Sequence, residues 1–562
     1  MRSKLILKIK KGEIFPDENN NKFSLDYSTP DKFKKDKIHF VNDNYHLLLD
    51  GVILNKKQLL LDHNSDNWTE LIIKLYKKIG RDFFKLLKGS YYGFIFNKKN
   101  NEWDVFTDHI GSKPIFHYED SNIFCISNDY SELVKYLKSQ KIKISLNEDA
   151  AYLIISYGYV FEDLTITNEI KRLLIGHSIQ INNSKLSLSK FFQLSNKEIE
   201  ISEEEAIESI DQRFRKSVKL AFEKDLEYNY EHTASLSGGL DSRMTVWVAN
   251  ELGFKNQNNL TFSQSDYLDE TVAKEIARDL KHEWIFKYLD NGTFLKNLEE
   301  ITKITGGNVL YYGLSHSQSF FSKLNFQNLG ILHTGQLGDV IISTFSSSPT
   351  AHQPYNFGDG AFSKKYLHKI PDFNFKENYK NEEIFKMYIR GFYGANQGLL
   401  ASMEYTETFS PFYDIDFLEF ALSIPIKYRY KHDLYIKWIT KKYPKAAEYI
   451  WEREKVPVNY RYWVKIKGQK IALKQIINRI KGKIGLAKYG SNTKNHMNPL
   501  QYWYNTNTEL RNWIDEYVEQ NLHIIDDYPK LKDDCTELFN SKEWTGKIQV
   551  LSLLSAVKLL KA

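Results

Sequence analysis

Few cysteines and no long apolar run are present, and these two absences set the first limits on the protein. The 562 residues contain only two cysteines, Cys125 and Cys535. Such a pair cannot supply a disulfide framework, a zinc knuckle or a CxxC redox motif, so we expect a reducing, cytoplasmic setting. The apolar start of the chain is interrupted by Lys8, and no stretch of about 18 uncharged apolar residues follows. We therefore expect a soluble protein with neither a signal peptide nor a membrane-spanning helix.

A strong excess of one charge is also missing. The chain has 77 Lys and Arg against 71 Asp and Glu, a formal net charge of +6. Spread over this length, that charge does not indicate a nucleic-acid partner. The hydrophobic content of 42% and aromatic content of 14% exclude wholesale disorder. The length predicts about two to four domains with room for a sizeable core.

Two regions with different secondary-structure patterns follow each other along the chain. The first reads as short strands joined by turns, with one helix among them; the strands are expected at 45–49, 89–96, 102–106 and 123–126, and the helix at 65–78. This pattern predicts an α+β domain with antiparallel sheets. Ser202 to Glu205 then forms a capping box ahead of an amphipathic run. We place the domain boundary just before it, giving domains of 1–195 and 200–562.

The second region alternates strands with helices. Strands are expected at 232–236, 260–262, 284–288 and 330–333, and helices from Arg243 and over 271–280. This alternation predicts an α/β domain with a parallel sheet. Beyond Glu382 the pattern is mainly helical to the end of the chain.

One segment of this region is suited to bind a polyphosphate. Ser237-Gly238-Gly239-Leu240-Asp241-Ser242 lies between the first strand and the following helix. The glycines allow a tight turn, and the serine hydroxyls and helix amides offer donors to phosphate oxygens. An acid in such a site repels phosphate unless a cation intervenes, so Asp241 is expected to be a Mg²⁺ ligand facing ATP. The alternative is that this segment is an ordinary strand-to-helix turn with no ligand.

These six residues resemble the pyrophosphate loop of the N-type ATP pyrophosphatases, and the segments around them resemble the asparagine synthetase B type. The further segments are 261–263, 334–339, 407–414 and 453–455. The resemblance implies an α+β Ntn-type four-layer N-terminal domain. An α/β parallel-sheet domain of the adenine nucleotide alpha hydrolase-like type, with a helical C-terminal part, would follow it.

The same resemblance implies roles for individual residues. Asp241 and Asp339 would bind Mg²⁺, and Lys455 would steady the leaving pyrophosphate. Gln336 and Tyr393 fall near the family's proton-relay positions. The ATP-binding set would be Leu236, Ser237, Gly238, Gly239, Asp241, Ser242, Ser263 and Gly335.

Upstream, Leu87 to Phe94 and Asp108 to Pro114 resemble the glutaminase domain that precedes this synthetase. That glutaminase needs a cysteine directly after the initiator methionine as its nucleophile. Position 2 is Arg2, and the family's Asn-Gly-Glu is replaced by Asp50-Gly51-Val52. We therefore expect a folded domain without glutaminase activity.

Two departures also occur in the synthetase-like region. Phe409 stands where the family has an arginine. Asparagine synthetase has a glutamate at the position of Gln336, and β-lactam synthetase a tyrosine. A glutamine amide cannot act as a base near neutral pH, although it can orient a nucleophile, and the related lasso-peptide cyclases tolerate glutamine there.

A basic stretch over 461–488 carries nine Lys or Arg and no Asp or Glu. Its apolar residues at helical spacing predict a basic amphipathic helix. The plain interpretation is a helix that packs against the protein through its apolar stripe and leaves its basic face in solvent. Docking to an anionic acceptor or a membrane surface is the alternative, whereas nucleic acid is disfavoured because the aromatics lie at the ends of the stretch. A homodimer is the candidate assembly.

The leading hypothesis is an ATP- and Mg²⁺-dependent ligase that activates a carboxylate as an acyl-adenylate and forms an amide with ammonia or a substrate amine. Its substrate would be a small-molecule, sugar-acid or peptide carboxylate. A peptide or lactam cyclase of the lasso-peptide or β-lactam synthetase type is the first alternative. A non-catalytic assembly protein is the second alternative. A tRNA-modifying pyrophosphatase is disfavoured because the sequence shows no sulfur-handling cysteine pair and no RNA-binding appendage.

Overall fold

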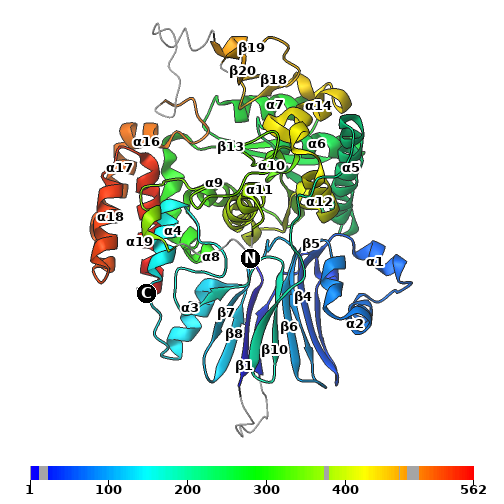
Figure 1. Ribbon diagram of the computed structural model, residues 1–562, viewed down its shortest axis with the longest axis vertical. Coiled ribbons are helices and arrows are strands. Elements are labelled where there is room, and N and C mark those ends of the chain that lie inside the picture. Colours follow the sequence, from blue (N-terminus) through cyan, green and yellow to red (C-terminus); the bar gives the residue numbers. More distant parts are fainter. Residues whose placement is uncertain (1, 12–22, 372–378, 467–468, 477–492, 562) are drawn as a thin grey trace.

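The computed structural model describes residues 2–11, 23–371, 379–466, 469–476 and 493–561 (Figure 1). Two antiparallel sheets lie at one end of the molecule, and a parallel sheet with its helices lies at the other. A group of C-terminal helices flanks them. This arrangement confirms the predicted order of an antiparallel region followed by a parallel one.

The antiparallel region contains a five-stranded and a six-stranded sheet. The first has the order β2 (Phe23–Ser28), β1 (Lys4–Lys10), β8 (Ile123–Ser127), β7 (Phe116–Glu119) and β9 (Lys171–Arg172). The second has the order β11 (Lys185–Lys190), β10 (His177–Asn182), β6 (Glu102–Thr107), β5 (Gly89–Asn97), β4 (Tyr45–Ile53) and β3 (Ile38–Val41). The four strands expected from the sequence are present as β4, β5, β6 and β8.

Alternating side chains bury both faces of the six-stranded sheet. Leu48 of β4 joins β1 and β8 in an apolar layer between the two sheets, whereas Leu47 and Leu49 point to the opposite face. There they pack against α2 (Trp68–Ile79), next to α1 (Lys56–Asp62). The helix α3 (Tyr130–Ser139) packs against β8 of the other sheet. The region is therefore layered as helix, sheet, sheet and helix.

The parallel sheet has the order β14 (Glu283–Tyr288), β13 (Gln257–Ser263), β12 (Glu231–Ser235), β15 (Leu329–His333) and β16 (Thr408–Phe409). Every neighbouring pair in it is parallel. Its helices α5 (Glu203–Glu227), α6 (Leu240–Glu251) and α7 (Leu268–Leu280) are drawn beside it in Figure 1. The predicted capping box at Ser202 and Glu205 begins α5.

Helices dominate the rest of the chain, as the sequence predicted. They are α8 (Leu298–Thr305), α9 (Tyr312–Phe321), α10 (Gly338–Ile342), α11 (Glu382–Lys386), the π-helix η6 (Met387–Gly394), α12 (Ile415–Ser423), α13 (Ile426–Arg429), α14 (Asp433–Lys442), α16 (Leu500–Thr506), α17 (Thr508–Asn521), α18 (Pro529–Phe539) and α19 (Trp544–Lys561). The strands β17 (Ile450–Trp451) and β18 (Val456–Pro457) form a small hairpin among them. In the described part of the chain, no helix is both long and apolar enough to cross a membrane.

The antiparallel and parallel regions share buried contacts. The helix α4 (Glu148–Ser156) packs against α19, and the two lie side by side in Figure 1. Lys113 forms an ion pair with Glu407 at 2.8 Å, and Lys88 forms one with Asp414 at 3.1 Å. One continuous apolar cluster contains side chains from both regions. The division at 195–200 stays a prediction.

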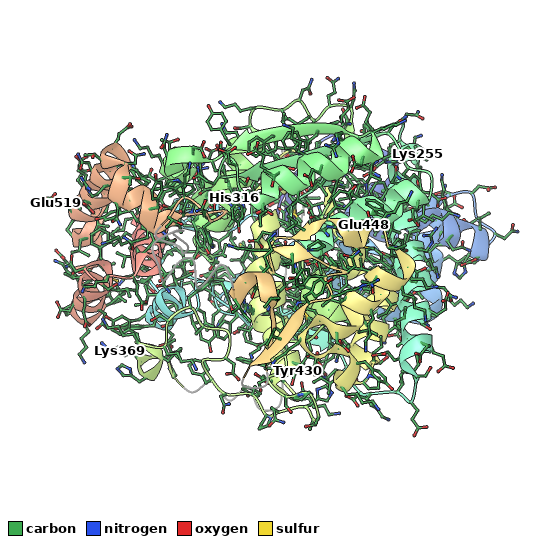
Figure 2. The ribbon with its side chains drawn as sticks, turned by 90° about the horizontal axis from the view of Figure 1, so that it is seen from above. Lys255, His316, Lys369, Tyr430, Glu448 and Glu519 are labelled. Atoms are coloured by element: carbon green, nitrogen blue, oxygen red, sulfur yellow. The ribbon has the colours of Figure 1, made fainter. Side chains whose placement is uncertain are left out.

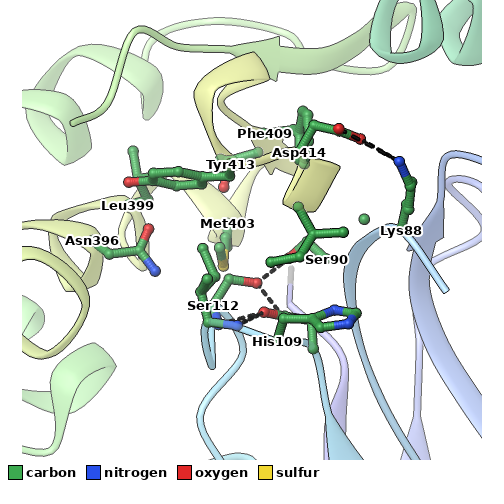
Figure 3. A pocket seen from close by; sticks show the side chains of 15 residues that line it. Lys88, Ser90, His109, Ser112, Asn396, Leu399, Met403, Phe409, Tyr413 and Asp414 are labelled. Carbon is green, nitrogen blue, oxygen red and sulfur yellow. Dashed lines mark hydrogen bonds and ion pairs between the residues drawn. The ribbon is translucent and has the colours of Figure 1, made fainter. Parts of the chain in front are cut away.

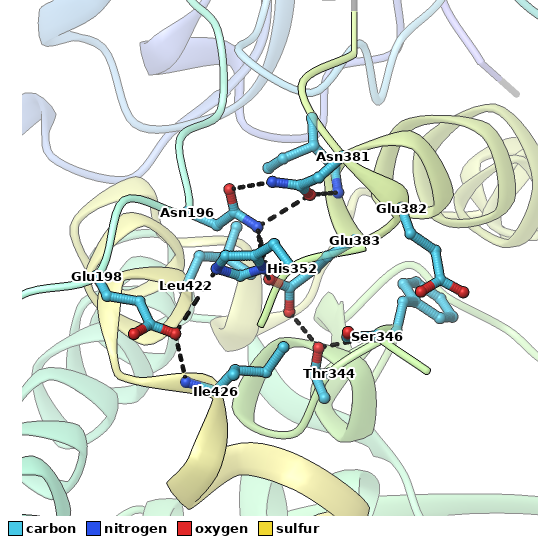
Figure 4. A network of polar contacts seen from close by, with 12 residues as sticks. Asn196, Glu198, Thr344, Ser346, His352, Asn381, Glu382, Glu383, Leu422 and Ile426 are labelled. Carbon is cyan, nitrogen blue, oxygen red and sulfur yellow. Dashed lines mark hydrogen bonds and ion pairs between the residues drawn. The ribbon is translucent and has the colours of Figure 1, made fainter. Parts of the chain in front are cut away.

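A buried polar network fixes the segment between the two regions (Figure 4). The Asn196 side-chain amide donates to Glu383 on α11 at 2.7 Å. Arg429 on α13 donates to both oxygens of Glu383, at 2.8 and 3.0 Å, and both side chains are fully buried. Because a buried charge is tolerated only when it is paired and hydrogen-bonded, this network ties the linking segment to α11 and α13.

The basic stretch over 461–488 differs from the predicted helix over 463–466 and 469–472, whereas residues 473–476 are helical as predicted. Residues Trp463–Ile466 (β19) and Gln469–Ala472 (β20) form an antiparallel hairpin. β-branched residues such as Val464 and Ile471 favour strands, which explains the difference. The remainder of the predicted helix, 477–488, lies outside the described residues.

Candidate functional site

A cavity of about 720 Å³ opens beyond the carboxyl ends of β12, β13 and β15. Ligands of parallel α/β sheets bind at this edge, because the loops that follow the strands meet there. The cavity wall includes Ser237, Gly239, Asp241 and Asp339 from the segments singled out in the sequence.

The predicted polyphosphate loop is a preorganised turn ahead of α6. The Ser237 amide donates to the Ser242 hydroxyl at 3.1 Å, and the two hydroxyl oxygens are 2.9 Å apart. The Gly239 amide donates to the Ser237 hydroxyl at 3.2 Å. Gly239 precedes α6 and no side chain caps the helix. The first amides of α6 therefore remain available to an anion.

The two predicted metal-binding acids meet in this cavity. The Asp339 amide donates to one carboxylate oxygen of Asp241 at 2.9 Å, and the Tyr435 hydroxyl donates to the other at 2.9 Å. Burial, followed by the nearby Asp339 charge, raises the pKa of Asp241 well above its usual range. Adjacent carboxylates of this kind attract a cation, and their all-oxygen donor set suits Mg²⁺.

Close backbone approach brings the two acids together. A Cβ on Gly335 would lie 2.2 Å from the Ser242 nitrogen, and one on Gly338 would lie 2.8 Å from the Asp241 carboxyl carbon. Only glycine fits at such distances. The sequence Gly335-Gln336-Leu337-Gly338 is thus required for Asp339 to reach Asp241.

A buried arginine joins the loop to the segment before β18. Arg243 on α6 donates to the Gly238 carbonyl at 3.1 Å and to the Ile450 carbonyl at 2.6 Å. Its guanidinium is fully buried. This contact brings Trp451, Glu452 and Arg453 into the cavity wall.

Two further acids lie on the cavity wall beneath the loop. The Gly238 amide donates to Asp269 at 2.9 Å, and the Tyr267 hydroxyl donates to Glu452. Burial, together with the charge of Glu452, raises the pKa of Asp269 to about 7. Asp269 is therefore partly protonated at neutral pH, which limits its repulsion of a polyphosphate.

The structure brings only part of the predicted site residues to the cavity. Gln336 lies on its wall, with its side-chain amide donating to the Ala395 carbonyl at 2.7 Å. Leu236, Ser242 and Gly335 also line it, whereas Gly238, Ser263 and Lys455 are not among the lining residues. Ser263 is buried and its hydroxyl donates to the Gln264 carbonyl at 3.0 Å.

Tyr393 lines a different, smaller cavity. Its hydroxyl accepts from the Ile175 amide at 3.4 Å, and the Arg172 guanidinium lies 4.9 Å from the ring centre. The family resemblance placed a proton-relay residue near Tyr393. In the structure the next two residues, Gly394 and Ala395, line the main cavity, and Tyr393 does not.

The segment 453–455 contributes a cation other than the predicted Lys455 to the main cavity. Arg453, two residues before Lys455, lies on the main cavity wall. Arg453 and Lys455 both lie in the short turn between β17 and β18. The predicted segment is therefore at the cavity, with the arginine as its lining cation.

A second, very small cavity lies where the antiparallel region contacts β16 and the turn after it (Figure 3). Its volume of about 20 Å³ has room for one water molecule. Ser112 donates to the buried carboxylate of Asp108 at 2.5 Å, and its hydroxyl lies 2.7 Å from that of Ser90. These contacts hold the Asp108 to Pro114 segment in place.

Neither cysteine of the chain is arranged as a nucleophile. Cys125 on β8 and Cys535 on α18 are both buried. Burial raises the pKa of each thiol to about 12, so both are protonated at neutral pH. Asp50, which stands at the start of the segment that replaces the family's Asn-Gly-Glu, accepts from Ser3 at 3.1 Å and from Tyr27 at 2.6 Å.

Comparison with known proteins finds one matching family and two similar named proteins. Residues 39–192 match a family described as a glutamine amidotransferase domain. A protein of Methanocaldococcus jannaschii named putative asparagine synthetase [glutamine-hydrolyzing] 2 is 28% identical over 46% of this chain and 52% of its own length. Asparagine synthetase [glutamine-hydrolyzing] 1 of Bacillus subtilis is 22% identical over 47% of this chain and 42% of its own length.

The chain thus spans about half the length of the curated relatives it matches. The domain match and these two relatives make the chain similar to asparagine synthetases over part of its length.

Two solved structures are also similar to this chain. One is a glutamine phosphoribosylpyrophosphate amidotransferase from B. subtilis complexed with ADP and GMP, at 11% identity, 75% coverage of this chain, 87% coverage of that chain and a TM-score of 0.23. The other is described as the allosteric regulatory enzyme of purine biosynthesis, at 11% identity, 75% and 86% coverage and a TM-score of 0.24. Superpositions this poor carry no argument about the fold.

Several lining residues were not predicted from the sequence. Asp269 and Glu452 lie close to the segments 261–263 and 453–455, and their acidity beside a phosphate-binding motif is the signal that could have found them. Tyr159 and Arg390 belong to no motif. They come from segments far apart in the chain, and only the fold brings them together.

Proposed function

We propose that the chain is an ATP-dependent amide-forming ligase that activates a carboxylate as an acyl-adenylate. The observation that carries this proposal is the meeting of Asp241 and Asp339 beside the uncapped start of α6 in one cavity. Similarity to proteins named asparagine synthetases supports it. The helical start would hold the polyphosphate of ATP, because free amides and the helix dipole favour anions.

In this reaction a carboxylate oxygen of the substrate bonds to the α-phosphorus of ATP, and the bond to pyrophosphate breaks. An amine nitrogen then attacks the acyl carbon, AMP leaves, and the nitrogen loses a proton. Asp241 and Asp339 would hold Mg²⁺, which neutralises phosphate charge as pyrophosphate leaves. Arg453 lies on the cavity wall and would stabilise the same charge. Gln336 would orient the nucleophile by hydrogen bonding.

For the antiparallel region we propose an Ntn-type fold that does not hydrolyse glutamine. The helix, sheet, sheet, helix layering and the amidotransferase match over 39–192 support the fold. The buried, protonated thiols of Cys125 and Cys535 support the lack of hydrolysis. Nitrogen would therefore come from free ammonia or from an amine of the substrate.

Exchange of labelled pyrophosphate into ATP tests the ligase proposal. The parent protein should catalyse exchange with at least one member of a panel of carboxylic acids. Asp241→Asn removes a carboxylate charge but keeps the side-chain shape, so exchange should fall by about a hundredfold or more. Exchange by the parent that is unchanged in Asp241→Asn would refute the role of the acid pair.

A further inference from the structure

A buried arginine without a polar partner lies between the antiparallel and parallel regions. Arg172 on β9 is 4% exposed, and its side chain forms no hydrogen bond or ion pair in the part of the chain that the structure describes. The centre of the Tyr393 ring lies 4.9 Å from its guanidinium. Burial lowers the pKa of Arg172 only to about 10, so the side chain is charged at neutral pH. Because a buried charge is tolerated only when it is paired and hydrogen-bonded, Arg172 requires an anion.

A second arginine lines the same small cavity, which we call the Arg172 cavity. This residue is Arg2, at the position where the family resemblance requires the glutaminase nucleophile. Its side chain is 8% exposed and donates from Nη2 to the Asn128 carbonyl at 3.3 Å, whereas its Nε atom has no hydrogen-bond partner among the described residues. Asp129 and Glu404 lie 3.7 and 3.9 Å away, beyond hydrogen-bond distance. Two positive side chains on one buried wall attract an anion.

The other polar side chains of the Arg172 cavity are engaged elsewhere. Asn308 accepts from the Ile166 amide at 2.9 Å and donates to the Thr305 carbonyl at 3.2 Å. Gln397 donates to the Phe392 carbonyl at 3.1 Å. Of the described residues, no Asp or Glu lines this cavity. The apolar lining residues are Pro114, Phe116, Ile304, Val309 and Leu400. The wall therefore offers unpaired N–H donors and an apolar surface but no carboxylate.

The size of the Arg172 cavity restricts the kind of anion. Its volume of about 10 Å³ is close to the least space that holds one water molecule. Phosphate, sulfate and carboxylates have several heavy atoms each and do not fit. A monatomic anion such as chloride has nearly the size of water, and it needs only N–H donors and a weakly polar wall.

The Arg172 cavity adjoins the main cavity. Val309 lines both of them, and it lies just before α9, whose His316 is labelled in Figure 2 and lines the main cavity. Leu400 directly follows η7 (Ala395–Leu399), whose Ala395 carbonyl accepts from Gln336 at 2.7 Å. An ion in the Arg172 cavity therefore supports the wall that carries Gln336.

We infer that the Arg172 cavity binds a monatomic anion of the halide class, held by Arg172 and Arg2. Chloride bound there neutralises the buried charge of Arg172. It also joins β9 of the antiparallel region to the segments around Val309 and Leu400. This inference goes beyond the proposed ligase function and does not depend on it, because the anion touches neither the polyphosphate loop nor the acid pair.

Halide replacement at constant ionic strength tests the inference. Thermal unfolding of the protein is measured in sodium gluconate, with chloride or bromide replacing gluconate in steps. Gluconate is too large for the cavity, so the melting temperature should rise with halide by about 1 °C or more and then level off, as one saturable site requires. A crystal soaked in bromide should show an anomalous scattering peak beside the Arg172 guanidinium.

Three variants separate halide binding from a general salt effect. Arg172→Met removes the charge and keeps an unbranched side chain, so the halide response should disappear. In gluconate this variant should be at least as stable as the parent, because no unpaired buried charge remains. Arg2→Met should weaken the apparent halide affinity by about tenfold, the contribution of a charge-assisted hydrogen bond. Arg278→Met is the matched control and should keep the parent's response, because Arg278 is exposed and lies outside this cavity lining.

Three results would overturn the inference. One is a parent melting temperature that is the same in gluconate and in halide. The second is a halide response that persists unchanged in Arg172→Met, which would assign it to another part of the protein. The third is a bromide-soaked crystal whose anomalous peaks all lie away from Arg172, which would leave water as the occupant of the cavity.

Discussion

At the scale of single residues, burial decides which acids near the loop carry charge. Asp269 accepts from the Gly238 amide, and burial with the nearby Glu452 raises its pKa to about 7. An ordinary aspartate in the unfolded chain has a pKa of about 3.9. Between these values the folded state binds more protons than the unfolded state, so the free energy of unfolding falls as the pH rises from about 4 to 7.

Replacing this acid should therefore stabilise the protein in a pH-dependent way. Asp269→Asn keeps an oxygen for the Gly238 amide and removes the buried charge. We expect a higher melting temperature than the parent at pH 8 and little difference at pH 4, measured by thermal unfolding without nucleotide. Asp279→Asn, at an exposed acid on α7, is the control. A difference that grows as the pH falls would contradict the assignment.

At the scale of elements, the turn from β15 to α10 packs closely against the start of α6. A Cβ at Gly335 would overlap backbone atoms of Asp241 and Ser242, which cannot move aside as a flexible side chain can. Gly335→Ala should lower the free energy of unfolding by about 1–3 kcal/mol and weaken nucleotide binding by about tenfold or more. Thermal unfolding and calorimetric titration with Mg²⁺ and an ATP analogue measure both effects.

A second glycine provides the comparison for this substitution. Gly313 on α9 has no atom within 4 Å of the position a Cβ would take. Gly313→Ala should leave stability unchanged or raise it by up to about 1 kcal/mol, because alanine favours a helix. Equal destabilisation by the two substitutions would show that the close packing at Gly335 is not the cause.

Elements with a periodic pattern could be predicted from the sequence. The strand before the loop, the capping box of α5 and the helix α7 lie where the apolar pattern placed them. Asp241 and Asp339 could be predicted as site residues because each lies in a short contiguous motif. Strand β1 was missed, because Lys8 interrupts its apolar run and its pairing partner β8 is distant in the chain. Tyr159 and Arg390 had no motif, since their proximity depends on packing between distant segments.

At the scale of the whole molecule, a buried ion pair holds the segment that links the two regions. Arg429→Met leaves Glu383 charged and buried without its partner. We expect the free energy of unfolding to fall by about 3 kcal/mol or more in denaturant titrations. Adding Glu383→Gln removes the unpaired charge and should recover part of this loss. A double variant that is no more stable than Arg429→Met would contradict this explanation.

The nitrogen source is likewise a property of the whole chain. With both thiols buried and protonated, product formation should depend on ammonium or a primary amine, and glutamine should not replace them. Amide formation with a carboxylate found by the exchange assay measures this. Cys125→Ala provides the control and should give the same dependence. Glutamine-supported turnover that is lost in Cys125→Ala would overturn the proposal.

The packing of α4 against α19 has a consequence for dissecting the protein. An expressed fragment that stops near residue 195 would retain the amidotransferase-like strands but lose the C-terminal partner of α4. The face of α4 that packs against α19 would then face water, and every residue of α4 from Ala150 to Ser156 is buried in the intact chain. Such a fragment should aggregate, and coexpression with the complementary fragment should restore its solubility.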